Sequence, residues 1–561
     1  MNSQTKKWKI LNKLPKGKKK VTSDDIINTL LKSRGIETAE KRKEFFNPAL
    51  PEKITLQSLK ISKSAVEKGI ARIKKAKKNK EKIIVYGDYD ADGITGTAVL
   101  WECLYALEAD TLPYIPDRFT EGYGLNPETI TKLKEKYPNL GLIISVDNGI
   151  VANKAVTQAN KLGIDVVITD HHKKGKTDPK ALAIIHTTEI GGSAVAWVFA
   201  REVRKTLKIP ESKFPTGDGL DLATIGTIAD QIPLLGANRS FVKYGLRALN
   251  KTTRPGLLSL FGEAGIKRGT IGTYTIGFII APRINAMGRL QHAMDALRLL
   301  CTKNKTQADE FALFLGKTNN NRRKIVEEVT VHAKAAVEGT VKTSIVVVHE
   351  SYHEGVIGLV ASRLVEKYYR PTIVISQGKE ISKASARSIP GFNIIDAIRN
   401  LEKLIIEAGG HPMAAGFSIK TSNIDKFTKA FEKETKLALS KEMLTKKMNV
   451  DLELNFDLLT NELAKSIATF EPTGSGNYAP VFATKAATVV EARTVGKTNT
   501  HLKLKVQESD KVFDSIAFGL GYLAPKLTLG CLIDIAYNLE ENEWNGRTSL
   551  QLNAKDIKIN G

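Results

Sequence analysis

Short apolar runs alternate with helical patterns between about residues 61 and 235. The apolar runs include IIVY, LGLIIS and IDVVIT, which are rich in β-branched residues and have the composition of strands buried on both faces. The segments between them include GTAVLWECLYAL and NKAVTQANKLG, which read as helices. Because strands that alternate with helices form parallel sheets, this pattern predicts a doubly wound α/β domain.

The remaining sequence predicts several further domains, since 561 residues are too many for one hydrophobic core. A second α/β pattern starts at SIVVVHE and runs through IIDAIRNLEKLIIEAGG. In a purely structural interpretation of this segment, Gly409 and Gly410 end a helix in the left-handed conformation. After about residue 450 the apolar period changes to two, which predicts antiparallel strands. The predicted parts are an N-terminal lead-in (1–60), the parallel-sheet domain (61–265), a helical connector ending in a long polar helix (266–338), a second α/β domain (339–445) and a small β-domain (446–561).

The chain is strongly basic, with 84 lysines and arginines against 60 acidic residues and a net charge of +24. This excess favours a polyanionic partner such as nucleic acid, although a lysine-rich surface can have the same composition without one. The start is polar, and no apolar stretch approaches the length of a membrane span. Cys103, Cys301 and Cys531 have neither metal-type spacing nor a disulfide framework. We therefore expect a cytoplasmic protein with no membrane partner.

The segment GDYDADG places aspartates at positions 88, 90 and 92, directly before a glycine. A calcium-binding EF-hand loop begins in this way, but it needs a glutamate where Val99 stands. It also needs a preceding helix, whereas KIIVY predicts a strand. The calcium-loop interpretation is therefore excluded, and the three carboxylates require another explanation.

Other acids and imidazoles follow the neighbouring predicted strands. Asp147 follows LIIS, while Asp170, His171 and His172 follow DVVIT, and a helical segment delivers Asp230. Each residue alone has an ordinary structural explanation, such as a turn, a helix cap or a surface histidine. Ligands of open parallel sheets bind at the carboxyl ends of the strands, and converging carboxylates repel each other unless cations neutralise them.

Mixed carboxylate and imidazole ligands suit Mn²⁺ or a similar ion, and Mg²⁺ can bind through the carboxylates. A carboxylate shared between two such ions builds a site that activates water and holds both reacting oxygens in a phosphoryl transfer. The residues therefore predict a centre for two divalent cations.

In this order, GDYDADG, VDNG, TDHH and GTIAD resemble the four motifs of the DHH phosphoesterase superfamily. The resemblance extends to the RecJ-type single-strand-specific exonucleases and covers nearly the whole chain. The N-terminal part of these exonucleases is resembled by LLKSRGI, FFNPAL and PDRFTEGYGL. Their middle and DHH-associated domains are resembled by APRINAMGRL, HEGVIGLVASRL, KASARSIPGFN and GGHPMAAGF. The start of their barrel is resembled by EPTGSGNYAPVF. The resemblance implies an α/β multidomain fold. A parallel-sheet DHH domain is joined by a long helix to an α/β DHH-associated domain, and an OB-like β-barrel follows.

The same resemblance implies roles for the metal ligands. Asp90 and Asp92 would bind different ions, and Asp147 would bridge them. His171 and Asp230 would complete the shell of one ion.

Three neighbours of these ligands have other expected roles. Asp88 either binds metal or orients the ligands, and both roles stay open. His172 would face the scissile phosphate and stabilise its developing charge, whereas Asp170 would hold a histidine tautomer.

The substrate-binding residues come partly from side-chain chemistry and partly from the resemblance. Arginine matches phosphate oxygens with two hydrogen bonds, and serine adds a hydroxyl donor. The resemblance assigns the 5′-terminal phosphate to Arg283, Asn285, Ser385 and Arg387. The residues expected to bind substrate are Arg118, Arg283, Asn285, Ser385, Arg387, Gly409, Gly410 and His411.

The resemblance thus implies an exonuclease that hydrolyses single-stranded DNA from the 5′ end to 5′-mononucleotides, in DNA repair and recombination. One alternative is a DHH phosphodiesterase for short oligoribonucleotides or cyclic dinucleotides, which would not need the barrel. Another is a non-catalytic replication scaffold, which would be expected to lose metal ligands. A helicase or a single-strand-binding protein is a candidate partner, and we expect a monomer.

Overall fold

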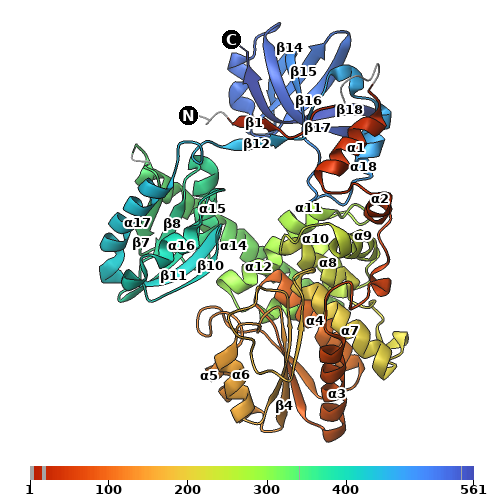
Figure 1. Cartoon of the computed structure of the whole chain (residues 1–561), viewed down its shortest axis with the longest axis vertical. Coiled ribbons are helices and arrows are strands. Elements are labelled where there is room, and N and C mark those ends of the chain that lie inside the picture. The colour runs from red at the N-terminus through yellow and green to blue at the C-terminus, as the bar shows by residue number, and fades with distance from the viewer. Residues whose placement is uncertain (1–5, 15–20, 340–341, 545, 561) are drawn as a thin grey trace. The chain divides into compact units, whose positions relative to one another are not determined.

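The computed structural model describes residues 6–14, 21–339, 342–544 and 546–560 (Figure 1). These residues form two compact units. One unit contains residues 47–329 together with 472–477. The other contains the described residues before Asn47 and the remaining ones after Val329.

A five-stranded parallel sheet forms the centre of the unit at 47–329. Its strand order is β3-β2-β4-β5-β6. The strands are β2 (Lys82–Tyr86), β3 (Thr111–Tyr114), β4 (Leu140–Val146), β5 (Asp165–Asp170) and β6 (Ala183–His186). The chain leaves β2 for β3 on one side and then returns to β4 on the other. The sheet therefore has its topological switch point between β2 and β4, where ligands bind in folds of this type.

Helices cover both faces of this sheet, which confirms the doubly wound prediction. Ile83 and Val85 of β2 point into the core formed with helices α3 (Lys63–Asn79), α4 (Ala91–Ala106) and α7 (Gly192–Leu207). Ile84 and Tyr86 point the other way, toward α5 (Pro127–Lys136) and α6 (Asn153–Lys161). Since successive side chains of a strand alternate between faces, an all-apolar strand needs both coverings.

Further helices extend the core of this unit: α8 (Leu220–Ala229), α9 (Gly236–Asn250), α10 (Pro255–Glu263), α11 (Thr273–Thr275), the π-helical turn η3 (Ile276–Ile280), α12 (Ala281–Leu290) and α13 (Met294–Cys301). The long polar helix predicted from the sequence is α14 (Lys305–Val337), which runs from this unit into the other.

The second unit contains a mixed five-stranded sheet of order β10-β11-β9-β8-β7. Its strands are β7 (Ile345–His349), β8 (Thr372–Ser376), β9 (Ile381–Arg387), β10 (Glu407–His411) and β11 (Ala414–Lys420). Helices α15 (Ile357–Tyr368), α16 (Ile394–Arg399) and α17 (Ile424–Ala438) accompany it.

The helix predicted to end at Gly409 and Gly410 is wrong. Helix α16 already ends at Arg399, and both glycines lie in β10, which pairs antiparallel with β11. Gly410 has a φ of +139°, and a side chain there would collide with the carbonyl oxygen of Ala414. The hairpin, not a helix cap, requires this glycine.

The C-terminal strands close into a barrel, as predicted. The barrel strands are β14 (Phe482–Val495), β15 (His501–Glu508), β16 (Lys511–Ala517), β17 (Leu532–Trp544) and β18 (Arg547–Ile559), and pairing of β14 with β17 closes them.

Part of the N-terminal lead-in packs with this barrel. Strand β1 (Lys7–Ile10) pairs with β12 (Lys447–Val450), and the Trp8 indole donates a hydrogen bond of 2.7 Å to Asp556. Helix α1 (Ser23–Ser33) packs against α18 (Asn461–Ala468).

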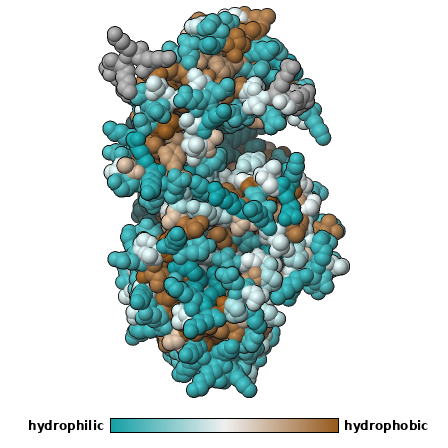
Figure 2. Space-filling view, turned by 90° about the vertical axis from the view of Figure 1, so that its right-hand side faces the viewer, coloured by the Kyte–Doolittle hydropathy of each residue, from teal (hydrophilic) through white to brown (hydrophobic). Residues whose placement is uncertain are grey.

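Hydrophilic residues cover most of the surface seen in Figure 2, with apolar residues in scattered groups. Within the described ranges, no helix has both the length and the hydropathy of a membrane span. Cys103, Cys301 and Cys531 are all free thiols.

Candidate metal centre

The predicted acids and histidines meet at the switch point of the parallel sheet. Asp88 lies two residues past β2, Asp147 directly follows β4, and Asp170 ends β5. These strands are neighbours in parallel register, with Tyr86 opposite Ser145 and Val146 opposite Thr169. Their carboxyl ends therefore carry the side chains to one place.

Helix N-termini hold two of the carboxylates in this cluster. Asp90 caps α4, and its Oδ1 accepts hydrogen bonds of 3.0 Å from the amides of Asp92 and Gly93. Asp92 accepts from the amides of Gly192 (2.7 Å) and Ser193 (3.0 Å) at the start of α7. Backbone N–H groups at a helix N-terminus are donors to carboxylate oxygens, so these hydrogen bonds fix the orientation of both side chains.

The backbone of Asp147 is in the left-handed region, with a φ of 62°. Aspartate and asparagine adopt this conformation more readily than most residues. A side chain at position 192 would collide with the Asp147 carboxylate, so Gly192 leaves the space that this acid occupies.

The ligand atoms form overlapping groups around Asp147. Those of Asp88, Asp90 and Asp147 lie within 4.8 Å of one another, as do those of Asp92, His171 and Asp230. His171 Nε2 lies 3.1 Å from Asp147 Oδ1 and 3.5 Å from Asp230 Oδ2, which links the two groups. Asp147 thus lies where a carboxylate that bridges two cations would be needed.

Two buried carboxylate oxygens, Asp88 Oδ1 and Asp147 Oδ1, accept no hydrogen bond from any described residue. Buried charged oxygens without a donor are costly, and a cation satisfies them. The donor set of carboxylates and one imidazole is also the set that suits Mn²⁺ and, through the oxygens, Mg²⁺. The residues present therefore fit two divalent cations.

Electrostatics points the same way. Burial and the charge of Asp92 and its neighbours raise the pKa of Asp147 well above its usual range, and burial together with Asp90 does the same for Asp88. Burial and Asp92 raise the pKa of Asp230 to about 8. Burial lowers the pKa of His171, which keeps its imidazole neutral and able to bind metal.

His172 has the opposite character. Its Nδ1 lies 2.8 Å from Asp170 Oδ1, and Asp170 also accepts from the amides of His171, His172 and Ile150. Burial disfavours the imidazolium, but the hydrogen bond and charge of Asp170 outweigh it and raise the pKa of His172 to about 9. His172 is therefore protonated at neutral pH, and its side chain is partly exposed.

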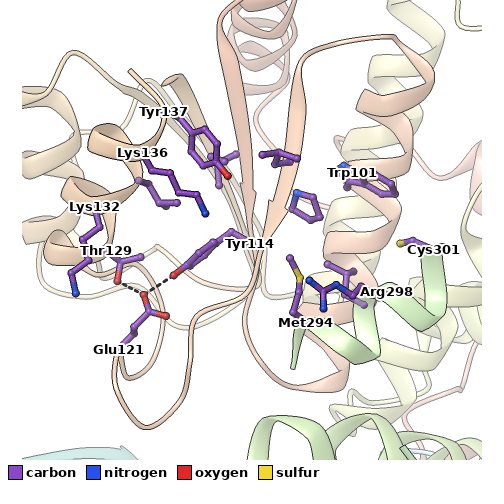
Figure 3. Close-up of a pocket in the computed structure, with 15 residues that line it drawn as sticks. Trp101, Tyr114, Glu121, Thr129, Lys132, Lys136, Tyr137, Met294, Arg298 and Cys301 are labelled. Carbon is purple, nitrogen blue, oxygen red and sulfur yellow. Dashed lines mark hydrogen bonds between the residues drawn. The ribbon is translucent and has the colours of Figure 1, made fainter. Parts of the chain in front are cut away.

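The loop after β3 carries Arg118 and Tyr123 to this centre. The Arg118 guanidinium lies 5.1 Å from the centroid of the Tyr89 ring, and the Tyr123 hydroxyl lies 3.4 Å from His172 Nε2. Glu121 anchors the loop, accepting hydrogen bonds from Tyr114 (2.7 Å) and Thr129 (2.6 Å), as Figure 3 shows.

The pocket in Figure 3, of about 600 Å³, lies beside β3 and is lined by residues such as Trp101, Tyr137 and Met294. Its lining contains none of the metal-ligand candidates. This pocket is therefore separate from the strand-end cluster of acids and histidines.

Helix α12 places Asn285 next to the aspartate loop, and Asn285 Oδ1 accepts a 2.8 Å hydrogen bond from the amide of Ala91. Asn285 thus supports the loop between Asp90 and Asp92. Arg283 forms a 2.7 Å ion pair with Glu263. Substrate contacts of Arg283 and Asn285 stay predictions.

The other predicted substrate residues lie together in the second unit. Ser385 and Arg387 are on β9, next to β11, which in turn pairs with β10 carrying Gly409, Gly410 and His411. Arg387 Nη1 donates to Ser385 Oγ at 3.2 Å. A side chain at Gly358 would come within 2.9 Å of both groups, so this glycine gives them room.

Two residues of the site were not assigned from the sequence. Tyr123 lies in the segment PDRFTEGYGL, whose resemblance to the RecJ-type exonucleases was the available signal. No sequence signal pointed to Gly192, because the collision that this glycine avoids involves Asp147, which is far away along the chain.

Known families and proteins match this chain along its length. The model of the "DHH family, N-terminal domain" matches residues 82–227, that of the "DHHA1 domain" matches 338–437, and that of the "RecJ OB domain" matches 450–556. The single-stranded-DNA-specific exonuclease RecJ of Bacillus subtilis (strain 168) is 36% identical over 547 residues, which cover 95% of this chain and 68% of that protein. The protein of the same name from Salmonella typhimurium is 30% identical, with 95% of each chain covered.

Solved structures match as well. The crystal structure of RecJ in complex with Mn²⁺ from Thermus thermophilus superposes with a TM-score of 0.83 at 29% identity, covering 100% of this chain and 80% of that one. The Mg²⁺ complex from the same organism gives a TM-score of 0.76 at 28% identity, covering 98% and 78%. By its domains, its relatives and its structure, the chain belongs to the RecJ family of DHH proteins.

Proposed function

We propose that the protein is a metal-dependent exonuclease that degrades single-stranded DNA from the 5′ end to 5′-mononucleotides, in DNA repair and recombination. The observation that carries this proposal is the buried cluster around Asp147, in which unpartnered carboxylate oxygens face neighbouring acids. Such a cluster is stable in its ionised form only with cations, and membership of the RecJ family supports the substrate class.

The proposed cofactors are two divalent cations, Mn²⁺ or Mg²⁺. Asp88, Asp90 and Asp147 would hold one ion, while Asp92, His171, Asp230 and the shared Asp147 would hold the other. When bound, such ions lower the pKa of water to give the nucleophile and stabilise the charge of the leaving oxygen.

The protein's own groups prepare the phosphate for attack. Protonated His172 would donate a hydrogen bond from Nε2 to a non-bridging oxygen, where negative charge grows in the transition state. Asp170 fixes the ring by its bond to Nδ1, so the donor is oriented before the substrate arrives. Arg118 adds a second positive charge on the loop side.

The direction of digestion would come from recognition of the DNA end. Arg387 and Ser385 present a guanidinium and a hydroxyl side by side, which matches a terminal 5′ phosphate. Gly409, Gly410 and His411 lie on the same sheet and would contact the strand there. The barrel would bind the single strand further along.

We further propose that the protein acts as a monomer in the cytoplasm, on strands that a helicase opens or a single-strand-binding protein covers. The basic net charge of +24 supports fast association with such polyanionic complexes.

The test is a panel of end-labelled substrates: single-stranded DNA, duplex DNA and RNA, each with Mn²⁺, Mg²⁺ or a chelator. We expect mononucleotide release from single-stranded DNA alone, with either metal, and no release in chelator. Preferred cleavage of RNA dinucleotides or cyclic dinucleotides would support the phosphodiesterase alternative instead. Binding without cleavage in every metal would support the scaffold.

A further inference from the structure

Two neighbouring aromatic rings protrude from the unit that holds the metal centre. Tyr274 is 68% exposed and Phe278 is 70% exposed, more than any other aromatic side chain described in this unit. Their rings are stacked, with centroids 4.8 Å apart and planes inclined by 23°. Large apolar groups gathered on a surface mark binding sites more often than chance exposure does.

The backbone under these rings is fixed. Tyr274 lies in α11 and Phe278 in the π-helical turn η3, a feature that is often found at functional sites. Ile276 and Ile280 of the same turn are fully buried, so the opposite side of the turn faces the core. The Thr273 hydroxyl also donates a 2.8 Å hydrogen bond to the carbonyl of Thr473. The backbone that carries the two rings is thus anchored to the core, which lowers the entropy cost of placing them on a ligand.

This segment is joined closely to the metal centre. A side chain at Gly277 would lie 3.9 Å from Ile228, which is two residues before the metal-ligand candidate Asp230. Helix α12 follows the turn directly and carries Asn285, which holds the amide of Ala91 between Asp90 and Asp92. The rings therefore stand on the same rigid segment that supports the metal ligands.

We infer that Tyr274 and Phe278 form a base-stacking platform for the single-stranded DNA substrate. This inference rests on the proposed function and names where a base of the substrate is held. An aromatic ring stacks on any base, so the platform would guide the strand without sequence preference. The loop before it carries the exposed cations Lys267 and Arg268, whose charge complements the DNA backbone.

The site also favours a nucleic acid over a protein partner. The turn that carries the rings lies next to Ile228, two residues before Asp230, and the loop before it carries exposed cations. A base unstacked from its neighbours, as in a single strand, can reach an exposed ring, whereas a paired base in a duplex cannot.

The test is a coupling measurement between the rings and individual bases. Binding of single-stranded oligonucleotides to the full chain is measured in chelator, so that no cleavage occurs, with an abasic site moved one position at a time from the 5′ end. For one position, we expect the missing base to weaken binding by the wild type about 5- to 150-fold, the worth of one base–aromatic stack. The same abasic site should hardly weaken binding by the Phe278→Ala variant or by the Tyr274→Ala/Phe278→Ala variant. It should weaken binding by Phe278→Tyr as it weakens binding by the wild type.

Tyr105→Ala is the matched control. Tyr105 is 58% exposed and packs on Trp101 one turn away, with ring centroids 5.3 Å apart, but it lies about 21 Å along α4 from Ala91 at 1.5 Å per residue. We expect this variant to respond to abasic sites as the wild type does.

Equal responses of the wild type and the double variant at every position would overturn the platform. That result would include the case in which the rings dock a protein. The Phe278→Leu variant separates ring stacking from apolar contact, because leucine keeps an apolar side chain without a ring. If the missing base weakens binding by this variant as much as binding by the wild type, the platform is also overturned. If the wild type neither binds single-stranded DNA in chelator nor cleaves it in Mn²⁺, the proposed function fails. The platform alone fails if the wild type binds and the rings make no difference.

Discussion

Replacing Asp147 by asparagine should stabilise the metal-free protein while it abolishes cleavage. Asp147 is buried, one of its oxygens has no hydrogen-bond donor, and its pKa is raised by burial and by the surrounding acids. Asparagine keeps the shape and tolerates the left-handed backbone, so the substitution removes mainly charge.

The size of this effect follows from the geometry. The ligand atoms of Asp88, Asp90 and Asp147 lie within 4.8 Å of one another, and two unit charges at that upper limit repel each other by about 3.5 kcal/mol at an effective dielectric constant of about 20. Proton uptake by the cluster relieves part of this repulsion, so we expect a gain of about 1–3 kcal/mol, or about 2–10 °C in the melting temperature of this unit.

The gain should depend on pH. The folded-state pKa of Asp147 lies above its unfolded value, so the wild type binds more protons when folded and loses stability as the pH rises through that interval. Asparagine does not titrate. The advantage of Asp147→Asn in chelator should therefore be larger at about pH 8 than at about pH 5.

Thermal melting in chelator and in Mn²⁺ measures both effects. The wild type should gain stability from Mn²⁺, and Asp147→Asn should gain much less. Asp178→Asn, which removes a half-exposed acid paired with Lys174, is the control and should change the melting temperature little. A less stable Asp147→Asn protein in chelator, with an unaltered response to Mn²⁺, would refute the cation-binding cluster.

Three further outcomes follow from other parts of the chain. Asp170→Asn removes the bond that raises the pKa of His172, so the pH above which cleavage declines should be lower in this variant than in the wild type; superimposable pH–rate profiles would exclude this role. Arg387→Ala should lose at least tenfold more activity on 5′-phosphate than on 5′-hydroxyl ends, and equal losses would remove it from the end-binding pocket. A chain of residues 47–445 lacks the barrel and the strand β1 that pairs beside it, and it should bind long single strands more weakly. Its plot of log binding constant against log salt concentration should have a slope that is shallower by about 0.7 for each phosphate it no longer neutralises. An unchanged slope would leave the barrel a structural role.

The sequence predicted the catalytic side of the molecule well because its signals are local. Apolar runs such as KIIVY predict buried strands, and the acids that follow them must then meet at one sheet edge, as Asp88 and Asp147 do. The prediction failed for the segment ending in Gly409 and Gly410, where a helix was expected. Its strand character comes from pairing with β11, a partner that local periodicity does not reveal.

The residues that support the metal-ligand candidates could not be predicted from local sequence patterns either. The role of Asn285 depends on a hydrogen bond to Ala91, 194 positions away along the chain. Gly192 is required only because Asp147 occupies the adjacent space. Such requirements appear when the tertiary structure brings distant segments together.

The central claim is that the Asp147 cluster binds the cations with which this protein cleaves single-stranded DNA. The most direct measurement is single-turnover cleavage of 5′-labelled single-stranded DNA while Mn²⁺ is titrated into metal-free protein, with bound Mn²⁺ counted in parallel. We predict that cleavage rises as two ions bind per wild-type chain, and that Asp147→Asn binds fewer ions and does not cleave at any concentration. Cleavage by the wild type in chelator, or undiminished cleavage by Asp147→Asn, would contradict the account.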